Sequence, residues 1–170
     1  MAIPIERTHF FHGLLLTTED LQREQDYLFA RLRRHNRYLH GWGVIHGLAV
    51  HVAGNRVQVN PGLAIDCAGN EIELQDALTA DLPAKPSPIY VGIRFCETPA
   101  APTPTIDGIM EHRVWCEAPE LSLDPDNASA YHARKGPGTP GCGIAHTVVI
   151  ARLARRQSRW QVRLLNQKRR

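Results

Sequence analysis

The sequence predicts an α+β, mainly β fold, in which one long N-terminal helix leads into an antiparallel β-sandwich or barrel. A helix with a clear start and a clear stop covers residues 17–41. After residue 44 the period changes, and apolar residues alternate with polar or small ones along several short segments. Strands at this spacing with no helices between them are typical of antiparallel sandwiches and barrels. We therefore expect a helical part at residues 1–43 and a β-domain at residues 44–170.

The helix has recognisable signals at both ends. Thr17 can cap its start, and Asp20 stands at the position that completes a capping box. Gly41 can supply the left-handed residue that ends the helix. Since no Pro or Gly interrupts the stretch, the helix should run for about 23 residues, or roughly 34 Å.

One face of this helix carries a stripe of six residues at helical spacing: Leu21, Gln25, Leu28, Leu32, His35 and Leu39. Two interpretations remain open. The stripe packs against the protein's own β-domain, or it forms a short coiled coil that makes the protein a homo-oligomer. In the second case the two polar members, Gln25 and His35, would set the register, and charging His35 in acid would weaken the assembly.

Glycines and one tryptophan mark the passage from helix to strand. Gly41, Gly43 and Gly47 fall within seven residues, which indicates tight backbone geometry. Trp42 lies among them, and we expect its ring to fill the joint between the helix and the β-domain. These four residues are therefore predicted to be structural.

The β-domain is expected to begin with four short strands in a meander between residues 48 and 74. Further strands are predicted at residues 89–95, within 109–117, at 146–153 and at 160–165. The connections between them are expected at residues 75–88, at the Pro-rich 99–104, and in a long irregular loop at 119–142. A loop of that length is usually functional or disordered.

Composition and charge exclude several classes of function. The net charge of +3 is too small to indicate a nucleic-acid partner, and no apolar run is long enough for a membrane span. No signal peptide is visible, so we expect a cytoplasmic protein whose four separated cysteines are free thiols. The basic cluster Arg31–Arg37 could bind phosphate, but a solvated or partner-facing surface is the favoured interpretation, and the tail Lys168–Arg170 adds further positive charge.

Candidate chemistry is sparse. Histidines crowd the first third of the chain, but their spacing matches no metal motif, and His35 and His40 would lie off a common α-helical face. No phosphate-binding loop or hydrolase signature is present. We therefore expect no catalytic residue, no cofactor and no stoichiometric zinc or nickel. A cysteine nucleophile paired with a histidine base stays open, because such pairs meet in space rather than in sequence.

The most specific strings of the chain carry a family resemblance. They are Phe11–Leu21, Glu24–Tyr27, His35–Val44 with Gly47-Leu48, and Val59–Ile72. Together they resemble small proteins encoded beside phage-tail-like contractile injection systems, and the last of them is similar to a β-segment of baseplate and tail-fibre-attachment proteins. The resemblance covers roughly residues 8–95, with weaker likeness at residues 146–153. It implies a structural, non-enzymatic role and offers no catalytic residues.

The sequence therefore predicts an assembly or adaptor component of a contractile tail-like particle, which binds other subunits of that particle. One alternative is a β-barrel module that binds a sugar or a metal. Another is an enzyme that uses a cysteine or histidine pair.

Overall fold

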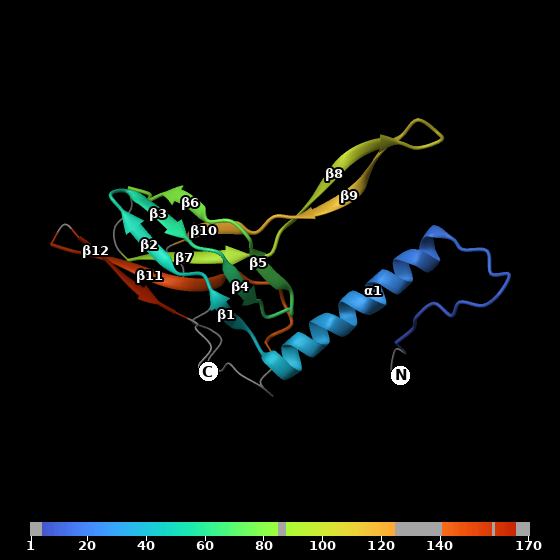
Figure 1. The fold of residues 1–170 in the computed structure, drawn as a ribbon, viewed down its shortest axis with the longest axis horizontal. Helices are drawn as coiled ribbons and strands as arrows, with labels where there is room; N and C mark the ends of the chain where they lie inside the picture. The colour runs from blue at the N-terminus through green and yellow to red at the C-terminus, as the bar shows by residue number, and fades with distance from the viewer. Residues whose placement is uncertain (1–4, 85–87, 125–140, 158, 166–170) are drawn as a thin grey trace.

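The computed structural model describes residues 5–84, 88–124, 141–157 and 159–165. It confirms a mainly β, antiparallel fold with one N-terminal helix. The strands gather into a β-body, and two elements extend from it on the same side (Figure 1). We call these elements the helical arm, α1, and the hairpin arm, β8–β9.

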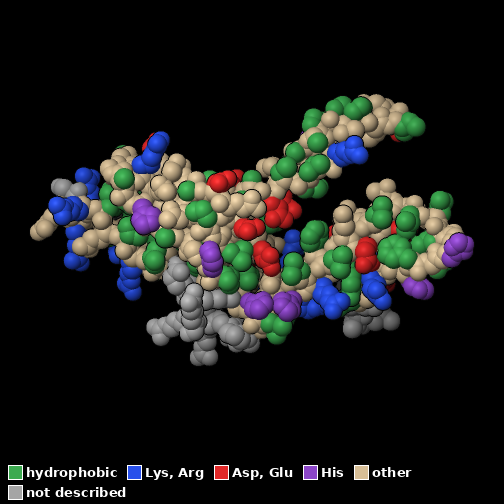
Figure 2. All heavy atoms as spheres, in the orientation of Figure 1, with side chains coloured by type: hydrophobic (Ala, Val, Ile, Leu, Met, Phe, Trp, Pro, Cys, Tyr) green, Lys and Arg blue, Asp and Glu red, His purple; other side chains and the backbone are tan. Residues whose placement is uncertain are grey.

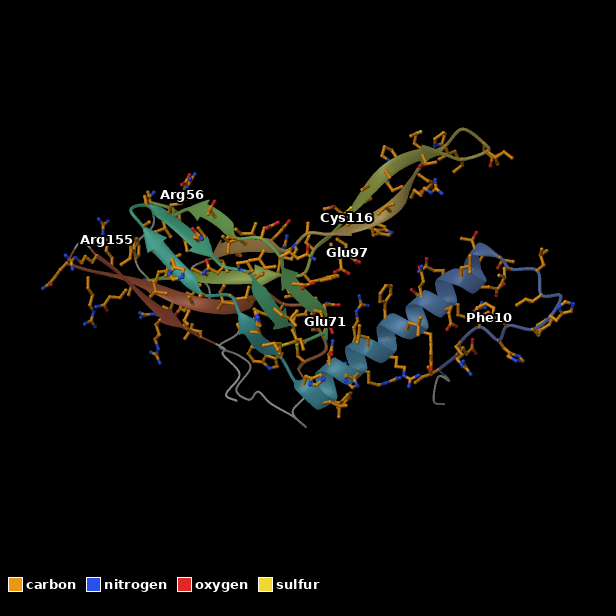
Figure 3. All side chains as sticks on the ribbon, in the orientation of Figure 1. Phe10, Arg56, Glu71, Glu97, Cys116 and Arg155 are labelled. Carbon is orange, nitrogen blue, oxygen red and sulfur yellow. The ribbon has the colours of Figure 1, made fainter. Side chains whose placement is uncertain are left out.

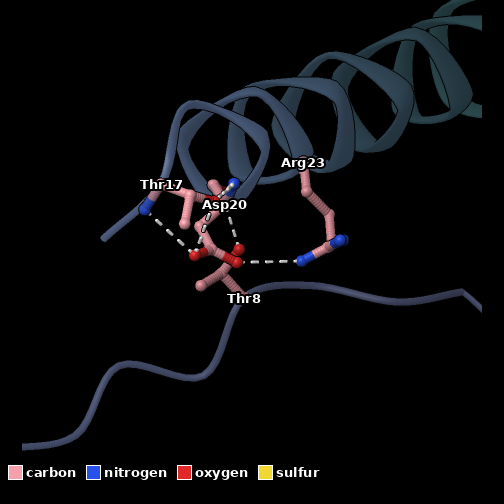
Figure 4. A network of polar contacts seen from close by, with 4 residues as sticks. All are labelled: Thr8, Thr17, Asp20 and Arg23. Carbon is pink, nitrogen blue, oxygen red and sulfur yellow. Dashed lines mark hydrogen bonds and ion pairs between the residues drawn. The ribbon is translucent and has the colours of Figure 1, made fainter. Parts of the chain in front are cut away.

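The helical arm, α1 (Thr18–His35), begins at the expected capping box. The Asp20 amide donates to Thr17 Oγ1 at 3.2 Å, and the Thr17 amide donates to Asp20 Oδ2 at 3.2 Å. Thr17 Oγ1 also donates to Asp20 Oδ2 at 3.0 Å. The two bonds that Thr17 donates to the Asp20 carboxylate, with Arg23 3.1 Å away, lower the pKa of this carboxyl (Figure 4). Thr8 Oγ1 donates to the Asp20 carbonyl at 2.7 Å, which ties the N-terminal segment to the start of the helix.

The helix ends differently from the expectation of continuous α-helix up to Gly41. A π-helical turn, η1 (Asn36–His40), follows α1 and leads to Gly41 with φ of 68°. In a π-turn, residues five apart come together because hydrogen bonds span five residues. The His35 and His40 Nε2 atoms therefore lie 3.2 Å apart. The expectation that these histidines lie off a common face was wrong because it assumed α-helical geometry.

The first strands of the β-body divide between two antiparallel sheets. One has the order β1-β4-β5 and the other β2-β3-β6. Their bounds are β1 Gly43–Gly47, β2 Val50–Ala53, β3 Arg56–Val59, β4 Gly62–Ile65, β5 Glu71–Leu74 and β6 Leu78–Asp81. The expected meander was wrong, because β3 and β4 do not pair. Between them the chain turns a corner at Asn60, whose amide donates to the Ala49 carbonyl at 2.9 Å.

The third sheet of the described β-body has the order β10-β7-β11-β12. Its strands are β7 Ile89–Arg94, β10 Glu120–Asp124, β11 Val148–Arg156 and β12 Arg159–Leu164. Its edges meet the β2-β3-β6 sheet on both sides, β12 beside β2 and β10 beside β6. The arrangement is a sandwich with nearly closed edges, and the core between its sheets includes Val57, Ile72, Ile93, Ile150 and Leu153.

Three expected connections contain strands. β6 lies inside the expected connection 75–88, and β10 forms the start of the expected loop 119–142. Residues 125–140 of that loop and the basic tail 168–170 lie outside the described residues. The Pro-rich stretch 99–104 is part of β8, so the loop expected there was also wrong.

The hairpin arm consists of β8 (Glu97–Pro104) and β9 (Met110–Glu117). Every residue of β9 is exposed. The prolines of β8 are tolerated because both strands of a two-stranded hairpin are edge strands, with outward positions where no backbone N–H is needed.

Candidate interaction surface

The foot of α1 is fixed to the turn between β4 and β5. Asn36, which is buried, donates from Nδ2 to the Gly69 carbonyl and to Glu71 Oε1, both at 3.0 Å. Arg33 Nε donates to Asn70 Oδ1 at 2.7 Å. A Cβ on Gly69 would lie 2.2 Å from the Arg33 carbonyl oxygen. The helix and the turn thus meet backbone against backbone, which fixes the direction of the arm.

The predicted joint residues lie in the interior beside this foot. Trp42 is only 2% exposed, and Gly41 and Gly43 are buried with φ of 68° and 117°. Gly47 has φ of 64°, and a Cβ there would lie 2.3 Å from the Pro61 carbonyl oxygen. The burial of Trp42 is what a structural role at this joint requires.

The helical stripe does not pack against the β-body. Its four leucines are 46 to 56% exposed, its polar members Gln25 and His35 are exposed, and α1 buries none of its residues. Among the described residues, the stripe therefore does not cover the protein's own core, which goes against the first interpretation. Within the described residues no helix has the length and apolar character needed to cross a membrane.

The hairpin arm also exposes apolar side chains. Trp115 is 65% exposed, and the other large apolar residues that reach solvent on this arm are Ile106, Ile109, Met110 and Val114. A two-stranded hairpin that packs against nothing is at best marginally stable in water. Both arms thus present apolar surface without a cover among the described residues.

A groove of about 340 Å³ lies between the two arms and the β4–β5 turn. Two members of the stripe, Gln25 and Leu32, lie on its helical wall. The charged and aromatic residues that line it are Asp26, Phe29, Arg33, Glu71, Phe95, Glu97, Trp115 and Glu117. Figure 2 shows acidic side chains gathered where the hairpin arm leaves the β-body. The sequence did not point to this groove, since its residues come from four separate segments.

Two pairs of side chains that could act as metal ligands or in nucleophilic catalysis come together in space. One is the His35–His40 pair of the π-turn, and the other is Cys142 with His146, whose Sγ and Nε2 lie 3.0 Å apart. The described cysteines are free, as expected. Cys142 is exposed, whereas Cys67 beside it is buried, and burial raises the pKa of the Cys67 thiol to about 11. Within the described ranges no three His, Cys, Asp or Glu side chains form a group that could hold a metal ion.

Comparisons with known proteins agree with the fold and the resemblance. No protein-family model matches the chain, and no curated protein sequence matches it. Among solved structures, the chain is similar to a chain of "The baseplate complex from the type VI secretion system", with a TM-score of 0.55 and 13% identity. At this identity the match shows a similar fold. The match covers 95% of this chain and 58% of the other, so this chain spans little more than half of its solved counterpart.

Proposed function

We propose that the chain is a structural component of a contractile, phage-tail-like particle, in which it acts as an assembly or adaptor subunit by binding other subunits. Two lines of support converge on this role. The sequence motif resembles proteins of such systems, and the fold is similar to a chain of a secretion-system baseplate complex. The role is non-enzymatic, and the protein is made in the cytoplasm and assembled into the particle.

The observation that carries the proposal is the exposed apolar surface of the two arms. The stripe leucines and Trp115 expose about half or more of their side chains. Contiguous exposed apolar surface on a folded chain marks a binding site. Each arm extends beyond the β-body (Figure 1), so a neighbouring subunit can reach it without disturbing the core.

The helical arm is proposed to bind through its stripe, as a short coiled-coil seam. Leu21, Leu28, Leu32 and Leu39 supply apolar contacts, and Gln25 and His35 specify the register. His35 lies 3.2 Å from His40 in the π-turn. A charged His35 would be costly to bury in an apolar seam, so association should be weaker in acid.

The test is the light-scattering mass of the protein at pH 7.5 and pH 5.5, for the wild type and for Leu28→Glu with Leu32→Glu. We expect an oligomer at tens of micromolar and neutral pH, a smaller mass in acid, and a monomer for the double variant. The matched control is Arg31→Gln with Arg34→Gln, which changes the net charge by the same amount at exposed positions of the same helix outside the stripe.

A wild type that stays monomeric would contradict association through the stripe. An oligomer that the Leu28→Glu and Leu32→Glu substitutions leave intact would move the interface to another surface. If the light-scattering mass fell equally in the double variant and in the control, association would depend on net charge and not on the stripe.

A further inference from the structure

The β11–β12 hairpin carries an unusual set of like charges. Arg152 is paired across the strands with Arg163, and Arg156 with Arg159. Strand alternation places all four on one face, while the intervening Leu153 points into the core. Like charges directly opposite each other destabilise an antiparallel pair. None of these four arginines forms an ion pair with a described residue. We call them the arginine face.

The groove between the arms shows the opposite charge in the same arrangement. Glu97 and Glu117 are cross-strand partners at the root of the hairpin arm. Asp26 and Glu71 add two more carboxylates to the lining. The only basic side chain among the described lining residues is Arg33, and its Nε is bonded to Asn70. The groove therefore holds an excess of negative charge.

These two surfaces lie too far apart to neutralise each other within one molecule. Figure 3 labels Arg155 at the end of the β-body that carries the β11–β12 turn, and Glu97 and Glu71 at the end that faces α1. In Figure 2 basic side chains gather at the first end and acidic ones at the root of the hairpin arm. A second copy of the chain can bring the surfaces together.

We propose that the arginine face of one copy docks into the acidic groove of the next, in a head-to-tail contact. Guanidinium groups pair with carboxylates in planar two-bond geometry, and they also stack on aromatic rings. Both kinds of partner are present in the groove, the carboxylates at positions 26, 71, 97 and 117 and the rings of Phe29 and Trp115. Docking places opposite charges beside each of the like-charge pairs.

A head-to-tail contact uses two different surfaces, so each copy can bind two neighbours. Such contacts build a ring if the rotation closes and a filament if it does not. The inference deepens the proposed function by naming one partner as the same chain. The contact is polar and the stripe seam is apolar, although Gln25 and Leu32 belong to both surfaces. Salt and the charge-reversal variants, which leave the stripe unchanged, separate the two contacts.

The experiment measures self-association by sedimentation velocity at about 50 mM and about 500 mM salt, where screening differs strongly. One variant carries Arg152→Glu with Arg163→Glu, and the other carries Glu97→Arg with Glu117→Arg. Each variant alone loses the charge contrast between its own two surfaces. The first change leaves two arginines and two glutamates on the arginine face, and the second leaves three basic side chains against two carboxylates in the groove. Association of each variant at low salt should therefore weaken about 10-fold or more. Mixed in equal amounts, the two variants have complementary surfaces and should associate again.

The variants are designed so that a loss of association cannot be explained by a loss of folding. Each double reversal replaces one like-charge pair with another, so thermal midpoints should stay close to the wild-type value. The single change Arg163→Glu instead places an acid opposite Arg152, and it should raise the melting temperature while weakening association. Arg31→Glu with Arg34→Glu on the helical arm makes the same charge change away from both surfaces and should leave salt-dependent association unchanged.

The proposal is overturned if the wild type is monomeric at low salt, or if its association does not respond to salt. It is also overturned if the mixture of the two reversed variants stays monomeric, because complementary surfaces would then have failed to bind. Loss of association in Leu28→Glu with Leu32→Glu, with both charge variants unaffected, would support the stripe seam and reject the head-to-tail contact.

Discussion

The β-body and the two arms use apolar side chains in opposite ways. Trp42 in the body is 2% exposed, and Trp115 on the hairpin arm is 65% exposed. Ile72 in the body is fully buried, whereas Leu28 on the helical arm has half its surface in solvent. The body therefore accounts for the stability of the fold, because burying apolar surface is the dominant favourable term in folding. The arms leave the same kind of surface free for binding.

The largest expected difference between the two regions is that of their tryptophans. Trp42→Ala should lower the free energy of unfolding by about 3–5 kcal/mol, since it opens a cavity at a packed joint. Trp115→Ala should change it by less than about 0.5 kcal/mol, as exposed substitutions usually do. The denaturant midpoints of the two variants compare them directly, when measured at protein concentrations too low for self-association.

An unchanged midpoint for Trp42→Ala would mean that the ring adds little to the core and is better interpreted as a binding residue. A large loss for Trp115→Ala would mean that the hairpin arm is part of the cooperative fold rather than a separate extension.

Sequence periodicity predicted the body better than the arms. The alternation around Val57 and Ile72 correctly indicated buried strands, and the Thr17–Asp20 box correctly located the start of α1. Both are local patterns whose physical cause lies within a few residues. The hairpin arm was missed in part because Pro99 and Pro102 suggested a loop, a rule that fails on edge strands.

The candidate interaction surface could not be derived from local pattern. Glu97 and Glu117 become partners only once the register of β8 and β9 is known, and Arg152 and Arg163 only once β11 and β12 pair. The stripe was visible as a pattern, but nothing in its spacing tells whether its leucines face the β-body or solvent. That depends on the direction of α1, which the contact at Gly69 sets.

The thiols of the two regions also differ in burial. The Cys67 thiol is buried in the body with its pKa raised to about 11, whereas Cys116 is exposed on the hairpin arm. At pH 8, Cys67 holds about 100-fold less thiolate than a thiol of ordinary pKa. Alkylation followed by mass spectrometry should therefore modify Cys116 long before Cys67.

The same pKa gives a pH dependence with a defined sign. The folded protein holds the Cys67 proton more tightly than the unfolded chain, so this contribution to stability is complete below about pH 9 and falls as the pH rises toward 11. Cys67→Ala should remove that fall. Equal labelling rates for Cys67 and Cys116 at pH 8 would contradict the buried, protonated state of Cys67.

The smallest expected effect separates two glycines with similar backbone angles. Gly69 at the foot of the helix has φ of 92°, and Gly108 near the tip of the hairpin arm has φ of 77°. Alanine at either position incurs the left-handed backbone strain, about 1–2 kcal/mol. At Gly108 nothing lies within 4 Å of the added Cβ, whereas at Gly69 the Arg33 carbonyl oxygen would be 2.2 Å away.

Gly69→Ala must therefore also push the helix off the β4–β5 turn, and its loss of unfolding free energy should exceed that of Gly108→Ala by about 1 kcal/mol or more. The displacement breaks the Asn36 bond to the Gly69 carbonyl. Hydrogen exchange should then speed up in the last turn of α1 for Gly69→Ala and stay unchanged there for Gly108→Ala. Equal stability losses with unchanged exchange would mean that backbone contact at Gly69 does not hold the helical arm in place, and that the arm is oriented by Trp42 and the π-turn instead.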